Sequence, residues 1–188
     1  MRSRDHVADS PVQVSEAALP PGALLVRYDG GGGYADCLVV TVPGHVTQAA
    51  YVEAFYTTAL FKLERLALAV LLARPSTDLE ARRLATGEVS SFAVWTVEAR
   101  EADQILLCDF VGASRSWLKS VVDTSAPVTT TTLYFGTALV PRKRGGGLGF
   151  GFRAMVPFHR LYAPALLRAA VRRLTAGQVQ AVVSRTSH

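Results

Sequence analysis

Apolar residues recur along this chain with two different spacings, which divide it into a helical part, a strand-rich part and a second helical part. The apolar run over residues 34–42 predicts a first strand, which Pro43-Gly44 ends. A glycine run precedes it at residues 30–33, but it leads into a strand rather than a helix, so a hairpin or linker is favoured over a phosphate-binding loop.

Helical spacing follows this strand. Thr47 is placed to cap a helix that continues through Tyr56, and Thr57-Thr58 interrupts the pattern. A second helix is predicted over residues 59–73, with Arg74-Pro75 as its end. The residues expected to turn inward are Ala50, Tyr51 and Phe55 in the first helix, and Leu60, Leu63, Ala67, Val70 and Leu71 in the second.

A third, short helix is predicted from its capping residues. Thr77 and Glu80 have the spacing of a capping box, and Gly87 is suited to the other end. The spacing then changes to two, and β-branched and aromatic residues dominate. Strands are therefore expected over residues 91–99, 103–111, 114–122 and 128–140, with Gly112-Ala113 in a tight hairpin.

The last helical pattern covers residues 150–174. Its inward stripe is Phe152, Met155, His159, Tyr162, Leu166, Ala169 and Ala170. Pro157 and Pro164 lie inside the pattern, so either the helix starts at Pro157 or it is kinked.

Charge is distributed unevenly over the 188 residues, although the net charge is only +5. Nine of the 20 basic residues and none of the 15 acidic residues come after Asp123. Such asymmetry can mark a face for nucleic acid or a membrane surface. The arginines of the last helix, however, lie mostly opposite its inward stripe, and no aromatic residues alternate with them for base stacking. The pattern therefore disfavours nucleic-acid binding.

The remaining composition is that of one soluble domain, with 49% hydrophobic and 19% charged residues. No signal peptide and no apolar run long enough to span a bilayer is found, so we expect a cytoplasmic protein. We interpret residues 1–23 as a flexible arm, 24–175 as the domain and 176–188 as a tail. Cys37 and Cys108 fit buried free thiols, and no spacing indicates a metal or a cofactor.

The order strand, helices, antiparallel strands, long helix resembles the START-like, or helix-grip (SRPBCC), superfamily over about residues 34–175. The segments that carry a closer likeness to uncharacterised bacterial proteins within it are EAFYTTALFKLERL, FAVWTVE with DQILLCDF, SWLKS, LYFGTALV and GFRAMVPFHRLYAPALL. The resemblance implies an α+β fold, in which a curved antiparallel sheet wraps around the long C-terminal helix and an apolar cavity often lies between them. Only five strands are clear here, with residues 23–28 as a candidate for one more.

His159 is the sharpest candidate for chemistry, because its stripe should point at the sheet and its pKa range suits proton transfer. A neutral, hydrogen-bonded core histidine is the alternative. Asp109 is its most plausible partner, but it can equally sit in water at a strand end or pair with Arg115. Nucleophilic catalysis lacks a motif, since Ser114 and Ser116 have no GxSxG context and Cys108 has no adjacent base.

Small-molecule binding is the function that this arrangement favours, with an apolar or aromatic ligand held between the sheet and the C-terminal helix. The residues expected to line that cavity are Phe61, Trp95, Trp117, Tyr134, Phe152, Met155, His159 and Tyr162. Ordinary core packing is the alternative for the aromatic residues. Two further hypotheses are a cyclase or hydratase that uses His159 with Asp109 or Tyr162, and a protein-interaction module that uses the basic C-terminal face.

Overall fold

Seven antiparallel strands form one sheet in the order β1-β2-β7-β6-β5-β4-β3. The computed structural model describes residues 12–29, 34–72, 75–140 and 160–177. Its elements are β1 (Ser15–Glu16), the 3₁₀ helix η1 (Leu24–Tyr28), β2 (Tyr34–Pro43), α1 (Gln48–Tyr56), α2 (Ala59–Leu72), α3 (Asp78–Thr86), β3 (Ser91–Phe92), β4 (Trp95–Glu101), β5 (Gln104–Asp109), β6 (Ser114–Asp123) and β7 (Thr130–Leu139). Residues 160–177 form a C-terminal helix. The fold is therefore α+β, as expected.

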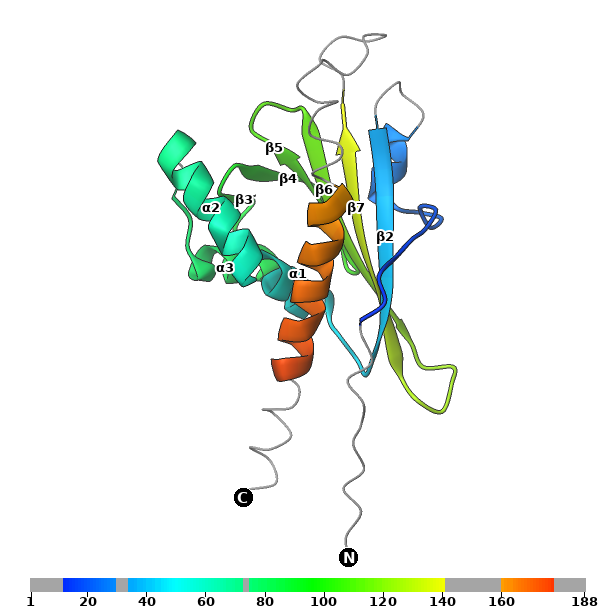
Figure 1. Ribbon diagram of the computed structural model, residues 1–188. Helices are drawn as coiled ribbons and strands as arrows, with labels where there is room; N and C mark the ends of the chain where they lie inside the picture. Colours follow the sequence, from blue (N-terminus) through cyan, green and yellow to red (C-terminus); the bar gives the residue numbers. More distant parts are fainter. Residues whose placement is uncertain (1–11, 30–33, 73–74, 141–159, 178–188) are drawn as a thin grey trace, which may run out of the picture.

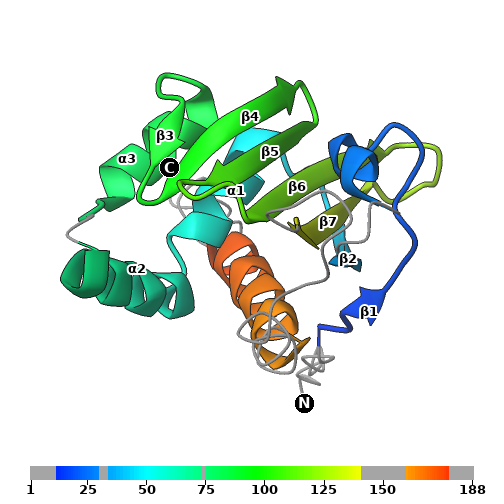
Figure 2. The same cartoon turned by 90° about the horizontal axis from the view of Figure 1, so that it is seen from above.

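Helices cover one face of the sheet, which we call the inner face. Figure 1 shows α1, α2, α3 and the C-terminal helix, coloured orange to red, on this side, and Figure 2 shows the same separation from above. The core between them is apolar and largely aromatic, because the inward residues of β2, β5, β6 and β7 alternate with outward ones. From the C-terminal helix it receives Ala163, Leu166, Leu167, Ala170 and Val171.

The three predicted helices form at the predicted places. The Thr47 side chain accepts a hydrogen bond from the Ala50 amide at the start of α1. Thr77 and Glu80 make the predicted capping box of α3, and Gly87 ends that helix with a φ of 86°. Because glycine lacks a Cβ, it adopts this left-handed conformation without steric cost. Local capping chemistry was thus sufficient to set these helix ends.

Three predictions about the sheet were wrong. Residues 23–28 form no strand, because η1 takes up Leu24–Tyr28. Residues 91–99 form a hairpin instead of one strand, since β3 and β4 pair as Phe92↔Trp95 and the chain turns at residues 93–94. Part of the expected N-terminal arm belongs to the sheet, because β1 pairs with Val39 and Leu38 of β2.

The inward faces of α1 and α2 also differ from the prediction. Ala50 is exposed, whereas Tyr51, Val52 and Phe55 are buried. In α2, Leu63 and Val70 are 64% and 76% exposed, although both were expected inside. In the C-terminal helix Leu166 and Ala170 are buried and Arg172 and Arg173 exposed, as predicted. Residues 150–159 of the predicted helix, including Phe152, Met155, Pro157 and His159, lie outside the described residues.

Candidate functional site

The inner face changes from apolar to polar along its strands. A central row across the sheet is apolar, with Leu38, Phe135, Leu118 and Ile105 in register. Toward the start of β2 the next row reads Asp36, Thr137, Ser116, Leu107 and Val97. Beyond it Tyr34, Leu139 and Ser114 are in register, Asp109 pairs with Trp95, and the Ser114 hydroxyl donates a hydrogen bond to Asp109. We call these last two groups of residues the polar end of the inner face. Several of its side chains are only half-buried.

Side chains of the polar end form hydrogen bonds with one another and with α1. The Tyr34 hydroxyl donates to Oδ2 of Asp36 at 3.0 Å, and the Thr137 amide donates to Oδ1 of the same carboxylate at 3.1 Å. The hydroxyls of Tyr56 and Ser116 share a hydrogen bond of 3.1 Å. Burial raises the pKa of Tyr56 well above its usual value, so this phenol remains protonated at neutral pH. Its role is to tie α1 to the sheet.

Asp109 lies at this polar end, but its carboxylate is hydrogen-bonded to residues of the turn that follows it. Its Oδ1 accepts from the Ala113 amide at 2.8 Å and its Oδ2 from the Ser114 hydroxyl at 3.0 Å. The Gly112 amide donates to the Asp109 carbonyl at 3.0 Å, and Gly112 has a φ of 70°. These contacts close the β5–β6 hairpin. The strand-end alternative therefore describes Asp109 better than proton transfer, and Arg115 pairs with Glu98 instead.

Tyr162 of the C-terminal helix packs against the core of the inner face. It is half-buried, and its hydroxyl donates a hydrogen bond to Oε2 of Glu64 in α2. Burial, and then the negative charge of Glu64, raise its pKa far above the usual value. A phenol held in this state donates a hydrogen bond and does not act as a general base near neutral pH.

Trp117 and Tyr134 lie on the opposite face of the sheet, so they do not line the space under the C-terminal helix. Trp117 is fully buried there with Leu25, Cys37, Leu106 and Ala138, and Tyr134 packs against the same cluster. The face of each strand could not be read from alternation alone, because a shift of one residue reverses it. Phe61 and Trp95, in contrast, contact the core of the inner face.

The middle of the inner face is filled in the part of the chain that the structure describes. Phe55 lies 4.7 Å from Phe135 and 5.2 Å from Tyr56, measured between ring centroids. Phe61 contacts Tyr56 at 4.9 Å and stacks with Phe92 at 6.2 Å. Phe61 is therefore a core residue within this aromatic cluster.

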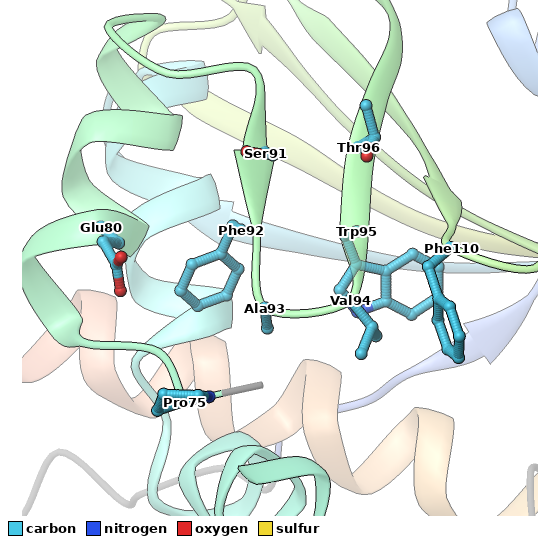
Figure 3. Close-up of a pocket in the computed structure, with 9 residues that line it drawn as sticks. All are labelled: Pro75, Glu80, Ser91, Phe92, Ala93, Val94, Trp95, Thr96 and Phe110. Carbon is cyan, nitrogen blue, oxygen red and sulfur yellow. The ribbon is translucent and has the colours of Figure 1, made fainter. Parts of the chain in front are cut away.

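A hollow of about 250 Å³ lies instead at the corner where α3 meets the β3–β4 hairpin. Phe92, Trp95 and Phe110 provide aromatic walls, and Figure 3 shows the indole of Trp95 beside the Phe110 ring. Glu80, Ser91 and Thr96 contribute polar groups, and Pro75, Ala93 and Val94 complete the lining. Trp95 also belongs to the polar end, so the hollow adjoins it.

Two features set this hollow apart from ordinary packing. The Trp95 Nε1 atom is buried and, among the described residues, has no hydrogen-bond partner. Such a donor is uncommon in native structures, because its desolvation is not offset. Ala93, in the hairpin turn of the lining, has a φ of 54°. A left-handed conformation costs a non-glycine residue energy, and such residues cluster at functional sites.

No group of three or more potential metal ligands occurs among the described residues. Within the same residues, no helix has the length and apolar character needed to cross a bilayer. Both cysteines are free; Cys37 is buried and Cys108 partly buried.

The chain matches no protein-family model, and comparisons with curated proteins and with solved structures found no match either.

Proposed function

We propose that this protein binds a small aromatic or apolar molecule that carries one hydrogen-bond acceptor, in the hollow beside Trp95. The observation that carries the proposal is the unpartnered, buried N–H of Trp95 in an aromatic wall. A ligand acceptor at this position would satisfy the donor, and the Phe110 ring beside the Trp95 indole would cover the apolar part of the molecule. The N–H is shielded from solvent, so neighbouring atoms must move before an acceptor can reach it.

The size of the hollow limits the ligand. Pockets for drug-sized molecules measure roughly 300–1,000 Å³, and this hollow has about 250 Å³. One or two fused rings fit this volume better than a long-chain lipid does. Glu80 is a poor partner for an anionic ligand, and its carboxylate already accepts hydrogen bonds from the Thr77 amide and hydroxyl. A neutral molecule with a carbonyl group is therefore favoured.

The finer description of the fold belongs to the same proposal. We infer a helix-grip arrangement of the START-like type, supported by the antiparallel sheet and the helix of residues 160–177 packed on its inner face. The ligand site proposed here differs from the cavity that the resemblance implies, because it lies at the α3 corner and not under the C-terminal helix.

The two tryptophans make a direct test possible, because each gives one indole signal in a ¹H–¹⁵N correlation spectrum. Acetophenone and ethylbenzene are matched probes of similar size, of which only the ketone offers an acceptor. We expect acetophenone to move the Trp95 signal, ethylbenzene to move it much less, and neither to move the signal of Trp117, which is on the other face. A W95F variant assigns the two signals.

Native mass spectrometry of protein purified from its source complements this titration by asking whether a small molecule remains bound. The proposal is overturned if acetophenone leaves the Trp95 signal unchanged, or if both probes shift it equally.

A further inference from the structure

Arg65 is a buried arginine of α2 whose guanidinium has several partners. Its side chain is 9% exposed. Nε donates a hydrogen bond of 3.0 Å to the Ser76 hydroxyl, and one terminal nitrogen donates to the Ser76 carbonyl. The other terminal nitrogen forms an ion pair of 2.7 Å with Asp78. The guanidinium carbon also lies 5.5 Å from the centre of the Phe92 ring. One planar group therefore joins α2 to the start of α3 and to β3.

The contacts of Arg65 converge on one side of the hollow. Pro75, Glu80 and Phe92 line this side, which we call the α3 side, and Figure 3 shows the three side chains there. Phe92 is within cation–π distance of the guanidinium. Pro75 directly precedes Ser76, and Glu80 is in the first turn of α3, which the ion pair fastens to α2. Arg65 is not itself a lining residue, so it acts on a ligand only through these residues.

A second residue of α2 supports the same ring. Phe61 lies four residues before Arg65, so the two side chains are on one face of the helix. The Phe61 ring stacks with the Phe92 ring at 6.2 Å between centroids. Of the α2 residues whose side chains are described, only Phe61 and Arg65 are buried. The attachment of α2 to the protein therefore includes the ring of a residue that lines the hollow.

We propose that Arg65 is a positioning residue for the hollow, through which ligand binding and the attachment of α2 are coupled. The inference rests on the ligand site proposed beside Trp95. Arg65 holds the α3 side of the hollow in one arrangement before a ligand binds, which lowers the ordering cost of binding. By linkage, a ligand in the hollow strengthens the attachment of α2 by the same free energy.

Titration of the full chain with acetophenone, followed at the Trp95 indole signal, gives the dissociation constant. R65A removes the guanidinium, whereas R65K keeps the positive charge but loses the planar fork. R82A is the matched control, because it removes an arginine of α3 that pairs with Glu53 and does not line the hollow. Circular dichroism verifies that each variant is folded.

Two further measurements separate positioning from stability. Q104A removes a buried side chain that accepts a hydrogen bond from Trp117 on the opposite face of the sheet, so it destabilises the fold without touching the hollow. The Nε–H group of Arg65 gives its own signal in a ¹H–¹⁵N spectrum of arginine side chains, because its hydrogen bond slows exchange with water. The Nε–H signal of Arg82 is the reference.

We expect R65A to weaken acetophenone binding about tenfold and R65K about threefold. R82A and Q104A should change the dissociation constant by less than about twofold. In the wild type, acetophenone should move the Arg65 Nε–H signal with the same midpoint as the Trp95 signal and leave the Arg82 signal in place.

The outcomes distinguish this inference from the proposed function. A wild type that does not bind acetophenone overturns the proposed function, and the inference with it. Wild-type binding with the same affinity in the Arg65 variants, or with an unmoved Arg65 signal, overturns the inference alone. An equal loss of affinity in Q104A would also overturn it, because the effect would then follow from lowered stability.

Discussion

The indole N–H of Trp117 donates a hydrogen bond of 2.8 Å to Oε1 of Gln104 on the outer face of the sheet. The same oxygen accepts from the Leu24 amide at 3.0 Å, and the Gln104 amide nitrogen donates to the Gly22 carbonyl at 3.0 Å and to Glu101. Gln104 is only 1% exposed, yet its side chain has a full set of partners. One buried amide thus joins β5, β6 and the chain around η1.

Replacement of Gln104 should therefore be costly. Q104A leaves the Trp117 N–H and two backbone groups without partners, so we expect a loss of about 2–4 kcal/mol in unfolding free energy. Urea denaturation measures it. Q48A is the matched control, because the Gln48 side chain donates a hydrogen bond to the Leu118 carbonyl and its buried Oε1 has no partner among the described residues. Its cost should be about 1 kcal/mol or less. Equal losses of unfolding free energy for the two variants would show that the hydrogen bonds of Gln104 contribute no more to stability than that of Gln48.

Gly136 allows Trp117 to pack as it does. A Cβ at this position would lie 2.6 Å from Cδ2 of Leu25 and 2.9 Å from Cε3 of Trp117. We expect G136A to lower the unfolding free energy by about 1–3 kcal/mol through overpacking. G177A is the control, because nothing lies within 4 Å of a Cβ added there and the position is helical. Thermal unfolding should show no loss for G177A, and an unperturbed G136A would mean that η1 moves away freely.

Secondary structure was predictable where local chemistry decides it, and less so where tertiary contacts do. The capping box at Thr77 and Glu80 predicted α3 correctly. In α2, periodicity favoured Leu63 and Val70 as inward residues, but Arg65 is buried instead. Its guanidinium stacks 5.5 Å from the centre of the Phe92 ring and binds Asp78 and Ser76. A pattern of apolar residues cannot foresee that an arginine will find such partners.

The place of the candidate site could not be predicted from the sequence. Trp95 was expected to line a cavity under the C-terminal helix, whereas the hollow that it lines is at the corner of α3 and the β3–β4 hairpin. Phe92, another aromatic wall of the hollow, was not expected beside Trp95, because residues 91–99 were interpreted as one strand. The hairpin at Ala93 brings Phe92 opposite Trp95. Alanine at a turn position with positive φ gives no sequence signal, since glycine or asparagine is the usual residue there.

Arg65 should contribute more to stability than an ordinary surface arginine. R65A loses the hydrogen bonds to Ser76, the ion pair with Asp78 and the stacking on Phe92, so we expect about 2–3 kcal/mol of destabilisation. R82A is the comparison, because the Arg82 side chain is 58% exposed and makes an ion pair with Glu53. Its effect should stay within about 0.5 kcal/mol. Chemical denaturation of both variants decides whether α2 is held by this buried guanidinium.

Alkaline pH should destabilise the protein through buried acids that keep their protons. Burial, and then the negative charge of Asp36, raise the pKa of the Cys37 thiol from 9.0 to about 12. Above about pH 9 the unfolded chain releases this proton while the folded chain retains it. The unfolding free energy then falls with pH, by about 1.4 kcal/mol per pH unit for one such group. Burial also raises the pKa of Tyr51 and Tyr56, which extends the loss above pH 10.

The serine variant C37S isolates the contribution of the Cys37 thiol. Serine does not titrate in this range, so the fall in unfolding free energy between about pH 8 and pH 10 should be smaller in C37S than in the wild type. C108S should reduce the fall less, because Cys108 is only partly buried and the positive charge of Arg115 opposes the rise in its pKa. Urea denaturation across this range measures the slopes. A thiol that keeps its proton only in the folded state must make the unfolding free energy fall with pH, and C37S removes that fall. The raised pKa of Cys37 would therefore be contradicted if the wild type showed no fall, or if C37S showed the same fall as the wild type.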